Sequence, residues 1–268
     1  MSPDAAPSAV VGLLVMAGLA ASALTWSAVA WRHSAGRLVL PAVARASTPR
    51  PVWAVLGAIG WTAFVLLNRV MADTLGERVE PQSEHVWLNL VLSAGVFTVL
   101  AVLLFGEWKF TPRDAGFVPT AMTIPLGVGT FLAAVLPTFA ALLALSPFRS
   151  RETQHQLLQL LGRSPDAVTL AGLAVTVVVL APLAEELLFR VTLQGWLSER
   201  IGGGWSVPVV AAIFAAVHGW RDGLALIPLA LLLGYIYERR QDYFAVVVAH
   251  GAFNAANLVL ALLSLAGS

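Results

Sequence analysis

The residues best suited to chemistry lie in three short motifs in the second half of the chain. Their polar members are Glu185, Glu186, Arg190, His218, His250 and Asn254. All of them stand inside or beside apolar runs, where an ionisable side chain is costly and normally faces a protein interior or a cavity. Carboxylates and imidazoles are the groups that transfer protons and bind metals in enzymes. We therefore take these three motifs as the candidate site.

The spacing within the first motif separates its two carboxylates. Residues four apart share a helix face, so Glu186 and Arg190 are predicted to pair, with the acid N-terminal to the base. Glu185 points about 100° away from its neighbour on a helix. Glu185 is therefore left without a local partner, and such a carboxylate in a low-dielectric site suits general acid or base catalysis.

The second and third motifs can reach the same place. Counting from the glycine turn at 202–204, Glu185 lies some 18 residues before Gly203 and His218 about 15 after it, which predicts similar depths on antiparallel helices. His250 and Asn254 are four apart and present two polar groups to one spot, at about 8 and 12 residues past Asp242. Phe214 lies one turn before His218 and is expected to wall the site.

The composition indicates that membrane helices position these motifs. Of the 268 residues 58% are hydrophobic and 12% charged, against about 25% charged in soluble domains, and the mean hydropathy is +0.80. Spans need about 20 apolar residues. The sequence predicts an all-α polytopic bundle of about eight spans: Ala9–Trp31, retained rather than cleaved, Val52–Ala72, Val86–Phe105, Ala121–Leu145, Ala167–Leu197, Trp205–His218, Leu224–Tyr237 and Phe244–Leu265.

The remaining segments complete the predicted organisation. Residues 1–148 form N-terminal membrane helices without a recognisable motif, and residues 160–265 form the core that carries the motifs. A short interfacial helix is expected near 150–163, polar on one side and rich in leucine on the other. Pro182 either kinks the long stretch or splits it into two spans. The net charge of +1 gives no reason to expect nucleic acid, and the absence of cysteine excludes disulfides and thiolate chemistry.

The motifs taken together resemble the CPBP family, which comprises type II CAAX prenyl proteases and bacteriocin-processing proteins. The matching segments are Glu185-Glu186-Leu187-Leu188-Phe189-Arg190, Phe214 to His218 and His250 to Asn254, in the family's order and spacing, with Pro182 before them and Gly234-Tyr235-Ile236-Tyr237 between the second and third motifs. The resemblance covers about 167–260 and implies a membrane-embedded endopeptidase.

Roles follow from this resemblance. It implies that Glu185 and His218 hold and activate the attacking water, and that His250 and Asn254 stabilise the oxyanion of the tetrahedral intermediate. Glu186 and Arg190 would brace the first motif. Two mechanisms stay open. Zinc could bind Glu185, His218 and His250, or a Glu–His pair could deprotonate water without metal. The chain lacks His-Glu-x-x-His, and we favour the metal-free reading.

Three classes of function are considered. The first is a protease that cleaves a peptide near the surface of the cell membrane, with a prenylated C-terminal tail, a bacteriocin leader or a C-terminal sorting tail as substrate. Its partners are then membrane lipid and a membrane-associated or lipidated protein. The second is a non-catalytic immunity or scaffold protein of the same fold. The third is a transporter or proton relay, which the absence of visible repeats disfavours.

Overall fold

The chain folds into helices, and the computed structural model describes residues 5–43, 48–75, 83–107, 109–148, 161 and 166–265. These described residues contain no strand. The helical elements are α1 (Ala5–Ser34), α2 (Val52–Leu75), α3 (Ser83–Phe105), α4 (Thr123–Leu145), η1 (Ser146–Phe148), α6 (Ala167–Val175), η3 (Thr176–Leu180), α7 (Ala181–Glu186), η4 (Leu187–Gln194), α8 (Gly195–Ile201), α9 (Gly203–Val217), α10 (Trp220–Arg240) and α11 (Tyr243–Leu265).

Six helical stretches are long and apolar enough to cross a membrane. They are Ala9–Ser34, Val52–Met71, Glu84–Phe105, Thr123–Leu145, Ala167–Ile201 and Tyr243–Leu265. Helix α9 is apolar but shorter, and α10 is a long helix that is not among these six. With α9 and α10, the described chain has eight main helical stretches. The prediction of an all-helical membrane bundle is therefore confirmed, and the protein is an integral membrane protein. The interfacial helix expected near 150–163 falls almost entirely outside the described residues.

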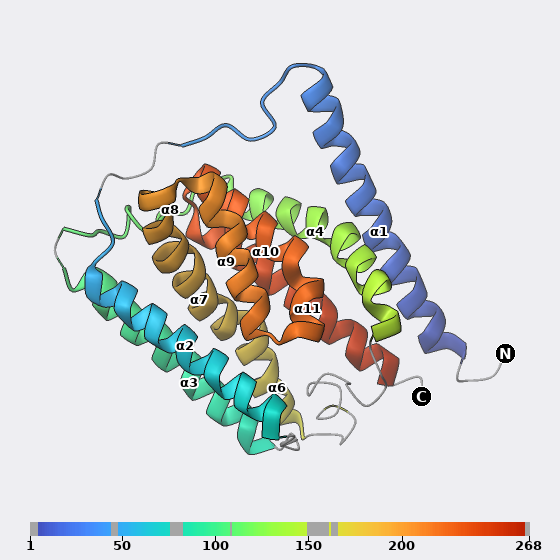
Figure 1. The fold of residues 1–268 in the computed structure, drawn as a ribbon. Coiled ribbons are helices and arrows are strands. Elements are labelled where there is room, and N and C mark those ends of the chain that lie inside the picture. The colour runs from blue at the N-terminus through green and yellow to red at the C-terminus, as the bar shows by residue number, and fades with distance from the viewer. Residues whose placement is uncertain are drawn as a thin grey trace.

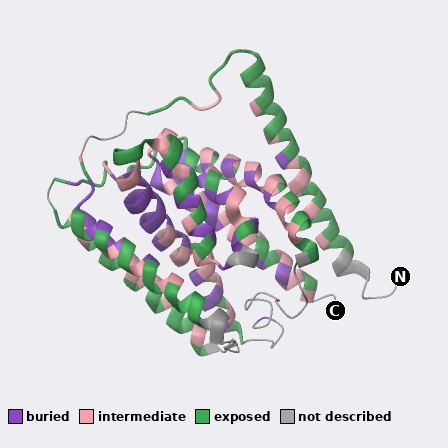
Figure 2. Cartoon of the chain, viewed as in Figure 1, coloured by how far each residue is buried: buried purple, intermediate pink, exposed green. Residues whose placement is uncertain are grey.

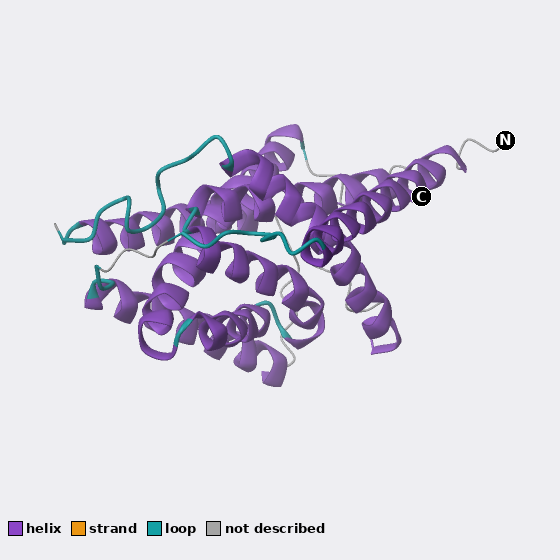
Figure 3. Ribbon diagram, turned by 90° about the horizontal axis from the view of Figure 1, so that it is seen from above, coloured by secondary structure: helices purple, strands orange, loops and turns teal. Residues whose placement is uncertain are grey.

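The helices enclose a polar centre and turn apolar side chains outward. Helices α2 and α3 lie side by side along one flank, α1 packs against α4 and α11 on the other, and the 167–201 helix, α9 and α10 fill the space between (Figure 1). Helices joined by loops make up the described chain (Figure 3). Buried residues gather on the central helices, whereas α1, α2 and α3 are largely exposed (Figure 2). Exposed residues include Leu13, Trp53 and Val91, while Glu186 and Arg190 are fully buried. Lipid is the solvent that suits this distribution.

Residues 167–201 form one continuous helix, so Pro182 does not split it. Asp166 caps its start by accepting hydrogen bonds from the main-chain N–H groups of Val168 and Thr169. A further hydrogen bond from the Thr169 hydroxyl holds the pKa of the Asp166 carboxyl below its usual value. The helix widens into π turns at η3 and η4 on either side of α7. Such widened turns recur at functional sites.

The first π turn explains how the helix tolerates Pro182. The N–H of Ala181 donates to Thr176 O, five residues back. In that register the next donor would be residue 182, bonded to Val177 O, but proline has no N–H. The carbonyl of Val177 is therefore left for another donor, and the side-chain amide of Asn254 takes it at 2.9 Å. A proline on one span thus fixes a side chain on another.

Glycines allow α11 to approach its neighbours closely. A Cβ added at Gly251 would lie 2.7 Å from Val178 O in η3, and one at Gly127 in α4 would lie 2.6 Å from Val248 Cγ1. Both contacts are shorter than packed atoms allow. The third motif is therefore held against the long helix on one side and α4 on the other, with little room for movement.

Candidate active site

Glu185 lies at the centre of the polar cluster. Its Oε2 is 3.8 Å from His218 Nε2 and 3.8 Å from His250 Nε2. The same oxygen is buried and has no hydrogen-bond partner within the described structure. Helices α7, α9 and α11 each contribute one of these three side chains. The structure thus brings together the carboxylate and both histidines that the motifs singled out.

Glu186 joins the first motif to the third. This side chain is fully buried; its Oε2 accepts a hydrogen bond from Arg190 Nε at 3.0 Å, and its Oε1 lies 2.8 Å from His250 Nδ1. The i,i+4 ion pair is the one that the spacing predicts. The spacing did not predict the bond to His250, because helix periodicity says nothing about residues that are 64 apart in the sequence. Glu186 therefore positions a histidine as well as pairing with an arginine.

The hydrogen bonds at Nδ1 set the tautomers of both histidines. His218 Nδ1 is 2.7 Å from Phe214 O, and a carbonyl can only accept, so Nδ1 carries the proton. An ionised carboxylate can also only accept, so Nδ1 of His250 carries a proton as well. In both rings Nε2 is the atom nearest Glu185 Oε2. The site therefore presents two Nε2 atoms to one carboxylate.

Phe214 forms the wall predicted for the site. Its ring centroid is 4.4 Å from that of His218 and 5.8 Å from that of His250, and the guanidinium carbon of Arg190 is 5.3 Å from it. The side chains of Glu185 and His218 are 28% and 30% exposed, but that of His250 only 4%. The cluster is therefore closed behind His250 and open on the side of Glu185 and His218.

Asn254 makes a contact that the spacing alone did not predict. The expectation places it with His250, facing one spot; in the structure its amide nitrogen donates to Val177 O. No described contact joins Asn254 to Glu185. One of its two amide hydrogens is therefore engaged in holding α11 to the π turn, and the other remains for a second partner.

Two further side chains contact the site's framework and were missed from sequence. The Tyr243 hydroxyl donates to Leu183 O at 2.7 Å and links the start of α11 to α7. Arg69 Nη2, from α2, donates to His218 O at 3.0 Å. Tyr243 offered no signal, but Arg69 did: it is an arginine inside an apolar run in the N-terminal half.

The donor set of the cluster suits zinc chemically, but its spacing does not. One carboxylate and two imidazoles are a known catalytic zinc set, and two ligands on one tetrahedral zinc stand about 3.3 Å apart. Glu185 Oε2 is 3.8 Å from each imidazole nitrogen. Within the part of the chain that the structure describes, no three His, Cys, Asp or Glu side chains are arranged to hold a metal ion.

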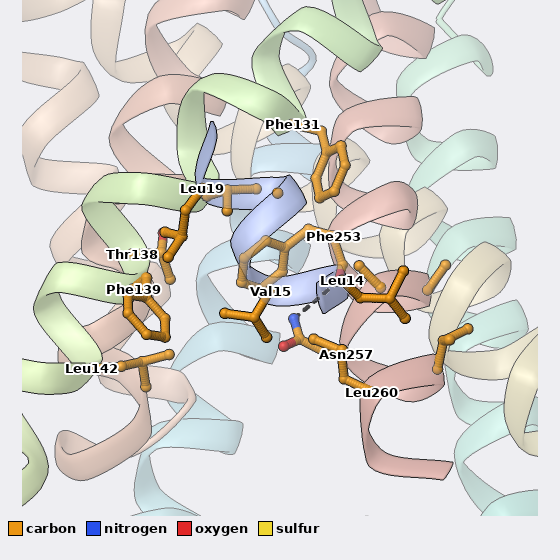
Figure 4. A pocket seen from close by; sticks show the side chains of 15 residues that line it. Leu14, Val15, Leu19, Phe131, Thr138, Phe139, Leu142, Phe253, Asn257 and Leu260 are labelled. Atoms are coloured by element: carbon orange, nitrogen blue, oxygen red, sulfur yellow. Dashed lines mark hydrogen bonds between the residues drawn. The ribbon is translucent and has the colours of Figure 1, made fainter. Parts of the chain in front are cut away.

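A separate apolar cavity lies between α1, α4 and α11. Its volume is about 380 Å³, and its lining includes Leu14, Phe131, Leu142, Phe253 and Leu260 (Figure 4). Asn257 is one of its few polar members, and its amide nitrogen is bonded to Phe253 O. No residue of the polar cluster lines this cavity. The cavity is apolar, lies on another face of α11 and is separate from the polar cluster.

Comparison with known proteins gives one match, and it covers the part of the chain that holds the cluster. Residues 167–256, about a third of the chain, match the family model of type II CAAX prenyl endopeptidase Rce1-like proteins. No curated protein and no solved structure matches the chain. The match begins at the helix that carries Glu185 and ends just after Asn254. Residues 167–256, which carry all three motifs, are therefore similar to the type II CAAX prenyl endopeptidase Rce1-like proteins.

Proposed function

We propose that this chain is an intramembrane endopeptidase in which Glu185 and His218 activate a water molecule to hydrolyse a peptide bond. One observation carries the proposal: a buried Glu185 oxygen with no hydrogen-bond partner stands 3.8 Å from two imidazole Nε2 atoms. That separation is too long for a direct hydrogen bond, so the Glu185 oxygen is left to hold a water molecule beside His218 Nε2. The exposed side of the pair gives a substrate access.

In the proposed attack, Glu185 Oε2 and the unprotonated His218 Nε2 both accept hydrogen bonds from the water. The water donates one hydrogen to Glu185 Oε2 and the other to His218 Nε2, which is an acceptor because Nδ1 holds the proton. Glu185 takes a proton as the water oxygen bonds to the peptide carbonyl carbon, and the carbonyl oxygen becomes an oxyanion. A positioned base of this kind contributes about 10²- to 10⁴-fold to a rate.

His250 is placed to stabilise that oxyanion. Its Nδ1–H stays bonded to the Glu186 carboxylate, and in the imidazolium form its Nε2–H donates to the oxyanion. The second amide hydrogen of Asn254 is a further candidate donor. Glu185 next passes its proton to the leaving nitrogen, and the C–N bond breaks. One water is consumed, the amine leaves with the proton from Glu185, and the new carboxylic acid loses its remaining proton to His218 Nε2 to become a carboxylate.

We propose that this hydrolysis needs no metal. The unpartnered Glu185 oxygen beside two imidazole nitrogens supports the proposal, because a Glu–His pair can deprotonate water without a metal. If zinc does bind, these three side chains would hold it, and it would supply Lewis-acid activation of the water.

The substrate is proposed to be a membrane-associated or lipidated protein cleaved near the surface of the cell membrane. Helix α9 carries His218 at its end, 15 residues from Gly203, which is about 23 Å along a core of about 30 Å. The cluster thus lies toward the membrane face opposite the Gly202 turn. A CAAX-type C-terminal tail is the substrate that the family match supports; leader peptides and sorting tails are the alternatives to assay.

The test is hydrolysis by purified protein in liposomes. Peptides representing the three substrate classes are incubated with the wild type, with Glu185→Gln and with Glu107→Gln, a matched control on an exposed loop carboxylate. We expect cleavage by the wild type and the control, and a loss of about 100-fold or more in Glu185→Gln. Wild-type protein that hydrolyses none of the peptides, or a Glu185→Gln variant as fast as the control, would favour the non-catalytic alternative.

A further inference from the structure

An arginine from the N-terminal half lies on the turn that ends the catalytic histidine's helix. Arg69 is exposed on α2, and its Nη2 donates to His218 O at 3.0 Å. The next residue, Gly219, has φ of +87°, and a Cβ there would lie 2.7 Å from Arg69 Nη2. The turn therefore needs glycine both for its backbone conformation and for the close approach of the guanidinium.

The positive charge of Arg69 is not used within the described structure. Its single hydrogen bond caps a carbonyl at the end of α9, which occupies one of five guanidinium donors. No described carboxylate forms an ion pair with it. A lysine or an amide could cap a helix end equally well, so capping alone does not explain a planar cation placed here. The remaining donors form a fork that matches a carboxylate.

His218 connects Arg69 to the reacting atoms. One residue, His218, joins the two places: its carbonyl oxygen is bonded to Arg69, and its Nε2 faces Glu185. Two or three extended residues span about 7–11 Å, which bridges a scissile bond at Glu185 and a terminal group at Arg69. Both Arg69 and the Glu185–His218 side of the cluster are exposed, so one peptide can reach both.

We propose that Arg69 binds the C-terminal carboxylate of the substrate, two or three residues beyond the bond that is cleaved. This rests on the proposed protease function and narrows it to C-terminal tails, because an internal leader cleavage site offers no carboxylate at that distance. A lipid phosphate is the other anion that a guanidinium could meet at this depth. The contact with the catalytic histidine's own carbonyl favours the substrate.

The experiment compares one peptide in two forms. A peptide with a prenylated cysteine followed by three apolar residues is made with a free C-terminal acid and with a C-terminal amide. The ratio of kcat/KM for acid over amide is measured in liposomes for the wild type, Arg69→Gln and Arg69→Lys. Arg200→Gln serves as the matched control, since Arg200 is an exposed arginine near the Gly202 turn, at the opposite end of α9.

We expect the wild type and Arg200→Gln to prefer the acid by roughly tenfold, the value of one charge-assisted contact. Arg69→Gln should bring the ratio to about 1, and Arg69→Lys should retain part of the preference. A wild type that cleaves both forms equally overturns the inference while leaving the protease function intact. An Arg69→Gln variant that slows both forms by the same factor, as loss of a helix cap or of a lipid contact would, also overturns it. Absence of any cleavage by the wild type would instead contradict the protease function itself.

Discussion

The buried Glu186–Arg190 pair yields a prediction in which stability and activity separate. Both side chains are fully buried, and their Oε2 and Nε atoms are 3.0 Å apart. Removing one partner leaves an uncompensated charge, which costs about 3–5 kcal/mol. The destabilisation by Arg190→Met should lie at the lower end of this range, because Glu186 keeps its bond to His250. The destabilisation by Glu186→Met should lie at the upper end of this range, because Arg190 then has no described carboxylate partner.

The double variant should lose much less than the sum of the two singles. Apolar side chains that replace a whole buried ion pair are often neutral or stabilising, so we expect a cost of about 0–2 kcal/mol and a coupling energy of at least about 3 kcal/mol. Thermal unfolding followed by tryptophan fluorescence in detergent measures this. At about 2–4 °C per kcal/mol, the singles should unfold roughly 6–20 °C lower. Proteolysis should nevertheless fall by about 10²-fold or more in the double variant, because His250 loses its orienting carboxylate.

A second ion pair provides the control. Arg50 and Glu199 are 2.8 Å apart; Arg50 is fully buried, but Glu199 is 24% exposed, so solvent partly screens this pair. The corresponding cycle should give a smaller coupling, of roughly 1–2 kcal/mol, and the double variant should keep its activity because neither residue contacts His250. Additive losses in the Glu186–Arg190 cycle, or full activity in its double variant, would refute the reasoning that this pair is both buried and tied to His250.

Two other outcomes follow from the same geometry. Dialysis against a chelator should leave peptide hydrolysis unchanged, and elemental analysis should find less than about 0.1 zinc per chain, because the proposed Glu185–His218 base needs no metal; stoichiometric zinc that activity requires would overturn the metal-free mechanism. Gly251→Ala should lower the unfolding temperature by a few degrees, about 1–3 kcal/mol, and slow hydrolysis, because its Cβ would lie 2.7 Å from Val178 O; Gly129→Ala, with open space at that Cβ, should do neither.

The membrane fold and the core of the site were predictable because their signals are local. Lengths of apolar runs give the spans, and the i,i+4 rule gives the Glu186–Arg190 pair. Counting residues from one turn put Glu185 and His218 at similar depths, and the two side chains do meet. These arguments need only regular helix geometry.

The features that sequence reasoning missed depend on irregular helix geometry or on distant partners. Asn254 bonds Val177 because a π register and Pro182 together free that carbonyl, and a 3.6-residue period contains no sign of a π turn. The bond from His250 to Glu186 and the bond from Arg69 to His218 O each join residues far apart in the chain. Tertiary packing decides them, and a single sequence carries no record of such pairs.

The most direct measurement of the central claim is the fate of water oxygen in a single turnover. Enzyme in excess over a prenylated peptide is mixed in ¹⁸O-labelled water, and the new carboxylate is analysed by mass spectrometry. If Glu185 activates water that attacks the peptide carbonyl directly, every first-turnover product carries one ¹⁸O, and Glu185→Gln forms almost none in the same time. An unlabelled carboxylate in the first turnover would contradict the account, because it is expected if Glu185 were itself the nucleophile. Cleavage by Glu185→Gln at the wild-type rate would contradict it as well.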